Sequence, residues 1–223
     1  MNSATLTKTT KVFSAPYAND VTVSGRWVQP QQDAELIHQW MNHPLVAPYW
    51  QQDKSLAEVL AYLQQQCRSY HQVMLLEINN TPVAYCELYR LQDDPLAQHI
   101  PADTKPSLAN STMGWHFLIG PNQLHGQGLG KLLGHALIHW LFQHYPISAL
   151  CCEPDIANIR MHKLLAYLQH QAVADIRLPS KRARLFVLYR AQLTTLLSPP
   201  TSHLLTLSKC VDQTSPTVRN IKQ

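Results

Sequence analysis

The sequence has few charges and no long apolar run, and each shortage narrows its class. Only 14% of its 223 residues are charged and the formal net charge is +4, so the dense basic patch of a nucleic-acid-binding domain is missing. No apolar run is long enough to span a bilayer, and the N-terminus lacks the apolar core of a signal peptide. We therefore expect a cytoplasmic protein that binds neither nucleic acid nor a membrane.

The five cysteines form no C-x-x-C pair, and Cys151 and Cys152 are adjacent within an apolar run. Such cysteines are more often reduced core residues than disulfides or reactive thiols. A metal site is not predicted either. His135 and His139 stand four residues apart, but the glutamate of an H-E-x-x-H motif and an evident third ligand are missing, so we expect surface histidines.

The charges that are present are unevenly distributed. From Arg177 to the end there are eight Lys or Arg and one acid. Residues 1–176 hold ten Lys or Arg and thirteen acids. Residues 1–20 are polar, and the chain beyond 192 has Ser, Thr and Pro clusters. We predict a polar N-terminal tail over 1–20, a single domain over 21–192, and a basic, partly irregular extension over 193–223.

Glycine is scarce, and its placement is the most informative feature of the sequence. Three of the seven glycines, Gly126, Gly128 and Gly130, alternate within five residues. They follow an apolar strand pattern over 113–119 and precede a helical apolar pattern. A glycine-rich turn before a helix presents backbone N–H groups at the positive end of the helix dipole, where a phosphate or pyrophosphate binds.

Three phosphate-binding designs contain such a turn, and spacing excludes two of them. A Walker loop needs four residues before its Gly-Lys and then Ser or Thr, but three residues separate Gly126 from Gly130, and Leu132 follows Lys131. A dinucleotide fingerprint needs G-x-G-x-x-G, but the spacing here is G-x-G-x-G. The pyrophosphate loop of acyl-CoA-dependent N-acyltransferases fits. An ordinary tight turn is the alternative.

Periodicity and turn residues predict the element order β α α β β β α β α β β. Ser55 and Glu58 form a capping box at the start of the second helix. The strand over 113–119, the next helix and the strand over 147–152 form a crossover that requires parallel pairing, whereas the hairpins are antiparallel. We therefore expect a mixed α/β (α+β) fold with about seven strands and helices on both faces. The predicted strands are 21–28, 73–78, 83–91, 113–119, 147–152, 172–178 and 184–190, with loops over 42–50 and 92–112.

Five sequence words carry a resemblance that runs from about Gln39 to Arg190. In order, they are HPLVAPYW, PVAYCELYRLQDD, GWHFLIGP, EPDIANIRMHKLL and LPSKRARL. Together with HGQGLG before a helix, they resemble the GNAT superfamily of acyl-CoA N-acyltransferases, and within it the hydroxamate-siderophore branch of hydroxylysine acetyltransferases and lysine N-acyltransferases. The resemblance implies a GNAT-like, mostly antiparallel twisted sheet that splays at its central parallel pair. It also implies direct transfer of an acyl group, by default acetyl, from acyl-CoA to an amine or N-hydroxyamine in siderophore biosynthesis.

The resemblance places the acyl-CoA co-substrate along the central strand and the glycine turn, with no permanently bound cofactor. The pantetheine arm would pair with the backbone near Leu118, Ile119 and Gly120. His125 stands where the family usually has Gln or Arg. The implied second partner is a small amine or hydroxylamine, and the protein would be a monomer or a homodimer. The residues implied in holding the pyrophosphate and the rest of CoA are Gly126, Gln127, Gly128, Leu129, Gly130, Lys131, Asn158 and Arg160.

Carried over residue by residue, the resemblance makes His116 a catalytic general base and Asp155 its acidic partner or a substrate contact. A base whose pKa lies near the working pH suits attack by nitrogen on a thioester. The alternatives are a strand histidine hydrogen-bonded in the core and an acid that starts the helix at Asn158. Four residues are implied in the acceptor site, although each also suits an exposed strand face or a solvated charge: Trp50, Glu87, Tyr89 and Lys181.

Two departures from the family pattern bear on substrate specificity. Thr112 occupies the position of a frequent acid, and Leu168-Gln169-His170 replaces the usual Gly-Phe after the last helix. Two other functions share the predicted architecture. An aminoglycoside N-acetyltransferase usually carries a more acidic acceptor cleft, and a catalytically silent acyl-CoA-binding module would bind CoA without turnover.

Overall fold

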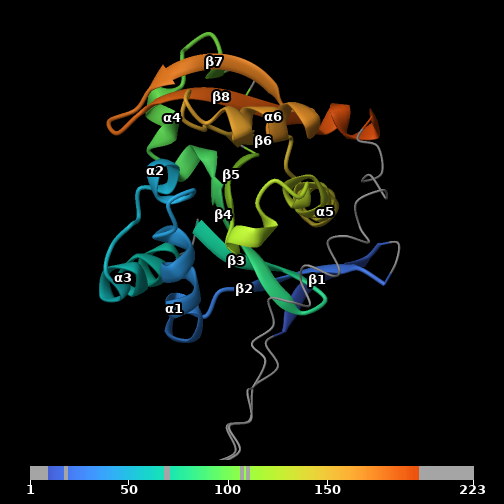
Figure 1. Ribbon diagram of the computed structural model, residues 1–223. Coiled ribbons are helices and arrows are strands. Elements are labelled where there is room, and N and C mark those ends of the chain that lie inside the picture. The colour runs from blue at the N-terminus through green and yellow to red at the C-terminus, as the bar shows by residue number, and fades with distance from the viewer. Residues whose placement is uncertain (1–9, 18–19, 68–70, 106–107, 109–110, 196–223) are drawn as a thin grey trace, which may run out of the picture.

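The computed structural model describes residues 10–195, except 18–19, 68–70, 106–107 and 109–110. The first nine residues of the predicted tail and residues 196–223 of the predicted extension lie outside the described part. Eight strands form a sheet in the order β1-β2-β3-β4-β5-β6-β8-β7 (Figure 1). They are β1 (Lys11–Pro16), β2 (Thr22–Trp27), β3 (His71–Ile78), β4 (Thr81–Arg90), β5 (Thr112–Ile119), β6 (Ala149–Cys152), β7 (Gln171–Arg177) and β8 (Arg182–Tyr189).

The parallel pair predicted from the glycine turn lies near the centre of this sheet. β5 and β6 are parallel, and the other neighbouring strands are antiparallel. The parallel pairing joins only residues 112–114 of β5 to 149–151 of β6, whereas β5 continues to Ile119 along β4. The two strands therefore part after Gly114. The mixed, splayed sheet is confirmed, with one strand more than expected.

Helices cover both faces of the sheet, as predicted (Figure 1). On one face, α1, α2 and α3 pack around a core that includes Ile37, Leu63 and Leu75. On the other face, α5 and α6 pack around Trp115 and Leu133. None of the helices that the structure describes is long and apolar enough to cross a membrane. The helices are α1 (Pro30–Met41), α2 (Ala47–Trp50), α3 (Leu56–Gln66), α4 (Leu96–His99), α5 (Leu129–His144) and α6 (Ile159–Tyr167), with 3₁₀ turns η1 (Leu91–Asp93), η3 (Asn122–Leu124) and η4 (Arg190–Thr195).

Several short elements correct the sequence prediction. β1 lies in the predicted polar tail, where the ring of Phe13 stacks on Trp140 with centroids 5.2 Å apart. α2 and α4 lie in segments predicted to be loops. α1 begins at Pro30, since proline suits the first helical position. The Asp33 carboxylate still accepts the Gln29 N–H at 2.7 Å. The capping box of Ser55 with Glu58 is confirmed.

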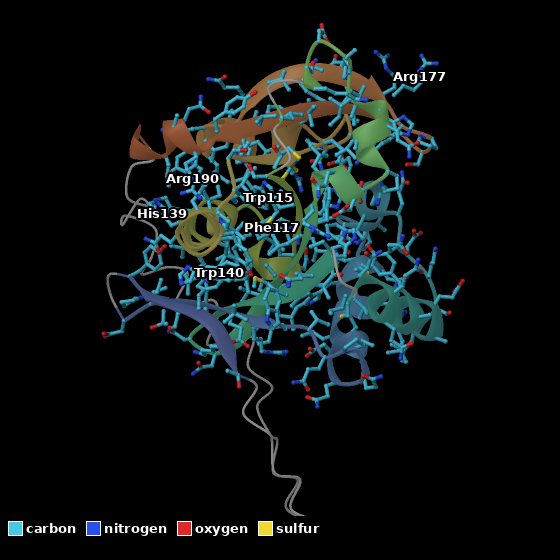
Figure 2. The ribbon with its side chains drawn as sticks, turned by 180° about the vertical axis from the view of Figure 1, so that it is seen from behind. Trp115, Phe117, His139, Trp140, Arg177 and Arg190 are labelled. Atoms are coloured by element: carbon cyan, nitrogen blue, oxygen red, sulfur yellow. The ribbon has the colours of Figure 1, made fainter. Side chains whose placement is uncertain are left out.

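Arg190 fixes the C-terminal end of α5 to the end of β8 (Figure 2). Its guanidinium donates to the carbonyl oxygens of Phe142 at 2.8 Å, and of Tyr145 and Ile147 at 2.7 Å. The Phe142 carbonyl is one that the end of α5 leaves without an intrahelical partner, and the other two carbonyls follow the helix. The contact holds the crossover helix in place behind the central strands.

The residues that replace Gly-Phe after α6 form the turn that ends this helix. Gln169 takes a left-handed conformation with φ +63°, which glycine adopts at less cost. The His170 N–H then bonds to the Leu165 carbonyl, as in a Schellman motif. The buried His170 ring lies with Nε2 3.3 Å from the indole nitrogen of Trp115 and Nδ1 3.2 Å from the Leu168 carbonyl oxygen. Burial lowers the pKa of His170 to about 4, so a neutral ring fills this core position.

Candidate active site

His116 lies on β5 two residues beyond the last parallel pair with β6. In the antiparallel register with β4 it stands directly opposite Glu87, so the two side chains project from the same face of the sheet. This is the face that α1, α2 and α3 cover. β5 therefore carries His116 to the point where the two central strands part.

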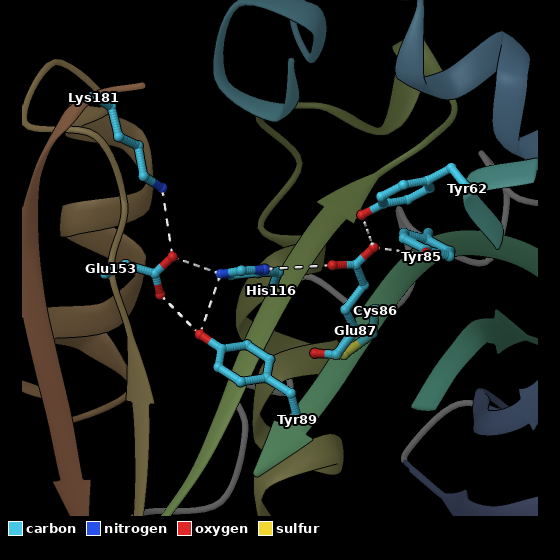
Figure 3. Close-up of polar contacts among 8 residues, drawn as sticks. All are labelled: Tyr62, Tyr85, Cys86, Glu87, Tyr89, His116, Glu153 and Lys181. Carbon is cyan, nitrogen blue, oxygen red and sulfur yellow. Dashed lines mark hydrogen bonds and ion pairs between the residues drawn. The ribbon is translucent and has the colours of Figure 1, made fainter. Parts of the chain in front are cut away.

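Both ring nitrogens of His116 face carboxylates (Figure 3). Nε2 lies 2.8 Å from Oε1 of Glu153, and Nδ1 lies 3.5 Å from Oε2 of Glu87. A neutral imidazole can donate from only one nitrogen, so this arrangement favours the doubly protonated ring. Burial alone would lower the pKa of His116, but the charges and hydrogen bonds of Glu153 and Glu87 outweigh it and raise that pKa.

Glu153, rather than Asp155, is the acidic partner of His116 in the structure. Glu153 follows the last residue of β6 and is 5% exposed. Burial opposes its charge, but His116 and Lys181 outweigh that cost and lower its pKa. The Asp155 carboxylate instead accepts the N–H of Ala157 at 2.7 Å, just before α6. The alternative considered for Asp155, a local acid before the helix, is what its contacts show.

Glu87 is buried beneath two tyrosine hydroxyls. The hydroxyl groups of Tyr62 on α3 and Tyr85 on β4 donate to its Oε1, the latter at 2.8 Å. Burial works against the charge of Glu87, but the hydrogen bonds from His116, Tyr62 and Tyr85 prevail and lower its pKa. Glu87 is therefore a fixed anion at the Nδ1 edge of the imidazole, on the side opposite Glu153, as Figure 3 shows.

Tyr89 completes the contacts of Glu153. Its hydroxyl donates to Oε2 of Glu153 at 3.0 Å and lies 3.4 Å from Nε2 of His116. The ring lies over Gly114, its register partner on β5: a Cβ at that position would come within 2.1 Å of the tyrosine ring. The glycine of the GWH word is therefore required by the close approach of Tyr89.

Two further predicted acceptor residues lie at this cluster. The ring of Trp50, the last residue of α2, stands edge-on to the His116 ring with centroids 6.2 Å apart. The ammonium of Lys181, just before β8, lies 3.6 Å from Oε1 of Glu153. The His116 side chain is 31% exposed, so a small molecule can reach it. The structure thus brings together Trp50, Glu87, Tyr89, His116 and Lys181.

The glycine turn has the backbone that its sequence predicts. Gly126 and Gly128 both have φ +77° and open space around the position of a Cβ. Gly128 is the N-cap of α5, and no side chain caps that helix end. His125, which leads the turn, stacks on His43 with centroids 5.9 Å apart. Burial lowers the pKa of His125, so its ring brings no fixed charge.

The other residues implied in CoA binding occupy distinct positions around α5 and α6. Gly130 packs against Leu164, so that a Cβ added to the glycine would lie 3.0 Å from the leucine side chain. Lys131 is exposed and its ammonium lies 4.3 Å from the centroid of the Tyr167 ring. Asn158 caps α6 by accepting the Met161 N–H at 3.1 Å. Leu118 and Leu129 are buried, and Gln127 and Arg160 are exposed.

The structure also locates the cysteines and the histidine pair that were predicted to have no catalytic or metal-binding role. Cys86, Cys151 and Cys152 are buried and free, and burial raises their thiol pKa values. His135 is only 8% exposed, so the expectation of a surface histidine is wrong there, and its ring lies 4.4 Å from that of His139. Within the described ranges, no group of three or more His, Cys, Asp or Glu side chains is placed to hold a metal ion.

Sequence reasoning missed Glu153, Tyr62 and Tyr85. Glu153 opens the EPDIANIRMHKLL word at the C-terminal end of the strand parallel to β5, where side chains converge on a site, but Asp155 lies at the same strand end, so this signal does not separate the two acids. Tyr85 lies two residues before Glu87 and so shares its face. Tyr62 is brought in from α3 by tertiary packing, and no local pattern marks it.

The chain is similar in sequence to known acetyltransferases. The family model described as "Acetyltransferase (GNAT) domain" matches residues 29–178. N-hydroxyputrescine acetyltransferase of Acinetobacter baumannii is 27% identical over 160 residues, which cover 71% of this chain and 74% of that protein. N(6)-hydroxylysine O-acetyltransferase of Escherichia coli is 28% identical over 165 residues, or 73% of this chain, and the chain spans half the length of that protein.

Solved structures show the same fold. An uncharacterised protein of Bacillus halodurans superposes with a TM-score of 0.75 at 26% identity, covering 82% of this chain and 92% of that one. Aminoglycoside acetyltransferase AAC(6')-Ib, solved with coenzyme A, gives a TM-score of 0.68 at 19% identity, covering 79% and 99%. Since the family model matches well over half of the sequence, the chain belongs to the GNAT acetyltransferase family and is an acyltransferase.

Proposed function

We propose that this protein transfers an acetyl group from acetyl-CoA to the nitrogen of an N-hydroxylated amine, forming a hydroxamate for siderophore biosynthesis. The observation that carries the proposal is His116 between two buried carboxylates, where β5 parts from β6. The names of the two relatives, one acting on N-hydroxyputrescine and one on hydroxylysine, support the acceptor class. Because acyl-CoA is a cytoplasmic metabolite, we expect the reaction to take place in the cytoplasm.

The acyl-CoA would lie in the opening between β5 and β6. Beyond Gly114, β5 pairs with β4 but has no ladder with β6, which leaves backbone groups near Leu118, Ile119 and Gly120 available to the pantetheine arm. The pyrophosphate would lie at the turn Gly126–Gly128 and the start of α5, where both glycines have φ +77° and no side chain caps the helix. Among the residues assigned to CoA binding, Lys131 and Arg160 are positively charged and would contribute positive charge near the pyrophosphate.

The chemistry requires one new C–N bond, loss of the C–S bond and movement of one proton from nitrogen to sulfur. A hydroxylamine nitrogen is mostly neutral at pH 7, so it can attack the thioester carbonyl directly. After attack the nitrogen is cationic and strongly acidic, so a carboxylate suffices to accept its proton. We assign this role to Glu153, which replaces Asp155 in the proposed pair.

In this scheme His116 acts as a charged group rather than as a neutral base. Its imidazolium would stabilise the negative charge that develops on the thioester oxygen. Glu87 contacts the ring at Nδ1, and Tyr89 and Lys181 contact Glu153. Glu153 would then pass the proton that it accepts from nitrogen to the departing thiolate, which completes the transfer of one proton from nitrogen to sulfur.

The experiment is release of free thiol from acetyl-CoA with N-hydroxyputrescine, N6-hydroxylysine or kanamycin as acceptor, each against a control without acceptor. Turnover on a hydroxylamine is expected. Turnover on kanamycin alone would support an aminoglycoside acetyltransferase. Tight binding of acetyl-CoA without turnover of any acceptor would support a silent binding module.

A further inference from the structure

Tyr62 connects the helical layer to His116 through Glu87 (Figure 3). It lies on α3, three residues after Val59 and next to Leu63, which are both buried in the core on this face of the sheet. Its hydroxyl donates to Oε1 of Glu87, and Oε2 of that carboxylate lies 3.5 Å from Nδ1 of His116. A helix residue is therefore separated from the His116 ring by one carboxylate.

Tyr85 supplies a second hydroxyl to the same oxygen. It lies on β4 two residues before Glu87, is fully buried, and donates to Oε1 at 2.8 Å. The ring of Trp50 on α2 stands edge-on to two rings here, with its centroid 5.6 Å from that of Tyr85 and 6.2 Å from that of His116. Side chains from α2, α3 and β4 therefore meet around the Glu87–His116 contact.

The Glu87–His116 contact is compatible with two positions of one proton. The proton either stays on Nδ1, which gives a charged pair, or moves to Oε2, which gives a neutral pair. The two hydroxyl donors to Oε1 favour the charged pair, because hydrogen bonds to an ionised carboxylate are stronger than those to a neutral acid. Burial has the opposite effect, since Glu87 is only 3% exposed. Loss of one hydroxyl therefore shifts the proton toward Oε2.

Other charged and titratable groups also surround the His116 ring. They are Glu153 beyond β6, Tyr89 on β4, Lys181 before β8, His71 on β3 and Asp94 after η1. Glu153 and Tyr89 approach Nε2, at 2.8 and 3.4 Å, whereas Glu87 lies at Nδ1. Tyr62→Phe and Tyr85→Phe alter none of these other groups and remove only a hydroxyl that bonds to Glu87.

We propose that Tyr62 is a positioning residue for acyl transfer, and that it acts through Glu87 to keep His116 doubly protonated. Tyr85 shares this role from β4. The inference rests on the proposed function, in which the imidazolium stabilises the negative charge that develops on the thioester oxygen. Because Tyr62 belongs to α3, the packing of this helix on the sheet determines the charge of a ring on β5.

The test measures protonation of the His116 ring by nitrogen NMR as pH is raised, with the full chain, isotope-labelled histidine and no substrate. The His116 signal is identified by its absence from His116→Asn. In Tyr62→Phe the ring should lose its proton about one pH unit or more below wild type, which is about a tenfold change in the protonation equilibrium. Tyr85→Phe should shift it in the same direction. Tyr145→Phe, which removes a hydroxyl just after α5 on the other face of the sheet, is the control and should cause no shift.

Kinetics with N-hydroxyputrescine as acceptor give a second measurement. The decline of kcat at high pH should move to lower pH in Tyr62→Phe by the same interval as the ring titration, while the KM for acetyl-CoA stays close to the wild-type value. In a Glu87→Gln background, Tyr62→Phe should cause no further shift, because the hydroxyl acts through the Glu87 carboxylate.

A His116 ring that titrates in Tyr62→Phe as it does in wild type would overturn the inference, as would a wild-type ring that is neutral at pH 7. An equal shift with and without the Glu87 carboxylate would also overturn it, since the hydroxyl would then act by another route. A wild type that acylates no hydroxylamine would overturn the proposed function, but the NMR titration needs no turnover and still shows whether Tyr62 controls the charge of His116. The two failures are therefore distinguishable.

Discussion

Nε2 of His116 lies 2.8 Å from Oε1 of Glu153, while Nδ1 of the same ring faces Glu87 at 3.5 Å. The imidazole is thus held between a carboxylate from β4 and another from the end of β6. Because both nitrogens face anions, the ring is cationic at rest. This relationship determines which residue accepts the proton in acyl transfer.

Replacing Glu153 should cost far more activity than replacing Asp155. Glu153→Gln keeps the shape of the side chain but removes the charge and the proton acceptor, so kcat should fall about 10²- to 10⁴-fold. Asp155→Asn removes only the charge of a group that bonds to Ala157, and kcat should change little. Steady-state thiol release checks both variants, with thermal unfolding to confirm that each is folded. A large loss in Asp155→Asn with an active Glu153→Gln would reverse the assignment.

The pH dependence of kcat should reflect a histidine whose pKa is raised. The charges of Glu153 and Glu87 outweigh burial and move the pKa of His116 to about 10. The protonated form therefore persists through neutral pH, and kcat should not rise as pH increases through the ordinary histidine value of about 6.5. In Glu153→Gln the pKa of His116 falls, so the residual kcat should decline with rising pH near neutrality. A wild-type kcat that climbs steadily from pH 6.5 to 9 would indicate a neutral base instead.

Gly114→Ala should disturb the site through Tyr89. The added Cβ would come within 2.1 Å of the Tyr89 ring, which must then leave Glu153. We expect kcat to fall at least as much as in Tyr89→Phe, which removes only the hydroxyl and should cost about 10-fold, as for one hydrogen bond to a charged group. The KM for acetyl-CoA should stay close to that of wild type in both variants. A Gly114→Ala enzyme with normal kcat would show that the close approach of Tyr89 is unimportant.

Gly128→Ala should weaken binding of acetyl-CoA. Gly128 has φ +77°, where an alanine costs roughly 1–2 kcal/mol, and relief of that strain would turn the backbone N–H groups away. The KM for acetyl-CoA should rise several-fold or more, with little change in kcat. Gly134→Ala, four residues further along α5 and outside the assigned CoA site, is the control, because its Cβ meets the flexible Leu168 side chain, at 2.6 Å. A larger rise in KM for the control would contradict the assigned site.

Gln169→Gly should stabilise the fold without changing activity. Gln169 has φ +63° after α6, and glycine avoids the left-handed penalty, so the free energy of unfolding should increase by about 1 kcal/mol. The same change at Gln64, an exposed position within α3, should instead decrease it by roughly 1 kcal/mol. Urea unfolding of both variants measures the difference. Destabilisation by Gln169→Gly would mean that the glutamine makes a contact worth more than the strain.

Local patterns were sufficient to predict the central architecture. A strand, a glycine turn and a helix require a crossover, so the parallel pair of β5 and β6 could be inferred from residues 113–152 alone. The edge strand β1 was missed because KVFSAP mixes polar and apolar residues without alternation. α2 was missed because four residues with a proline give too little periodicity to detect.

The site was predicted only in part, for a physical reason. His116, Glu87 and Tyr89 lie in recognisable words on adjacent strands. The choice between Glu153 and Asp155 depends on where the chain turns after β6, and two acids separated by one proline give no local indication of which one points to His116. Tyr62 reaches Glu87 from α3, 25 residues away in sequence. Such contacts arise from the packing of the helix on the sheet, so only the folded structure identifies them.

The most direct test of the central claim is identification of the product formed from acetyl-CoA and N-hydroxyputrescine. An N-acetyl-N-hydroxy product is a hydroxamate and forms a coloured complex with Fe³⁺, whereas an O-acetyl ester does not. We predict that one hydroxamate forms for each thiol released, and that Glu153→Gln lowers both signals together by the same factor. Thiol release without hydroxamate, or hydroxamate formation that survives in Glu153→Gln at the wild-type rate, would contradict this claim.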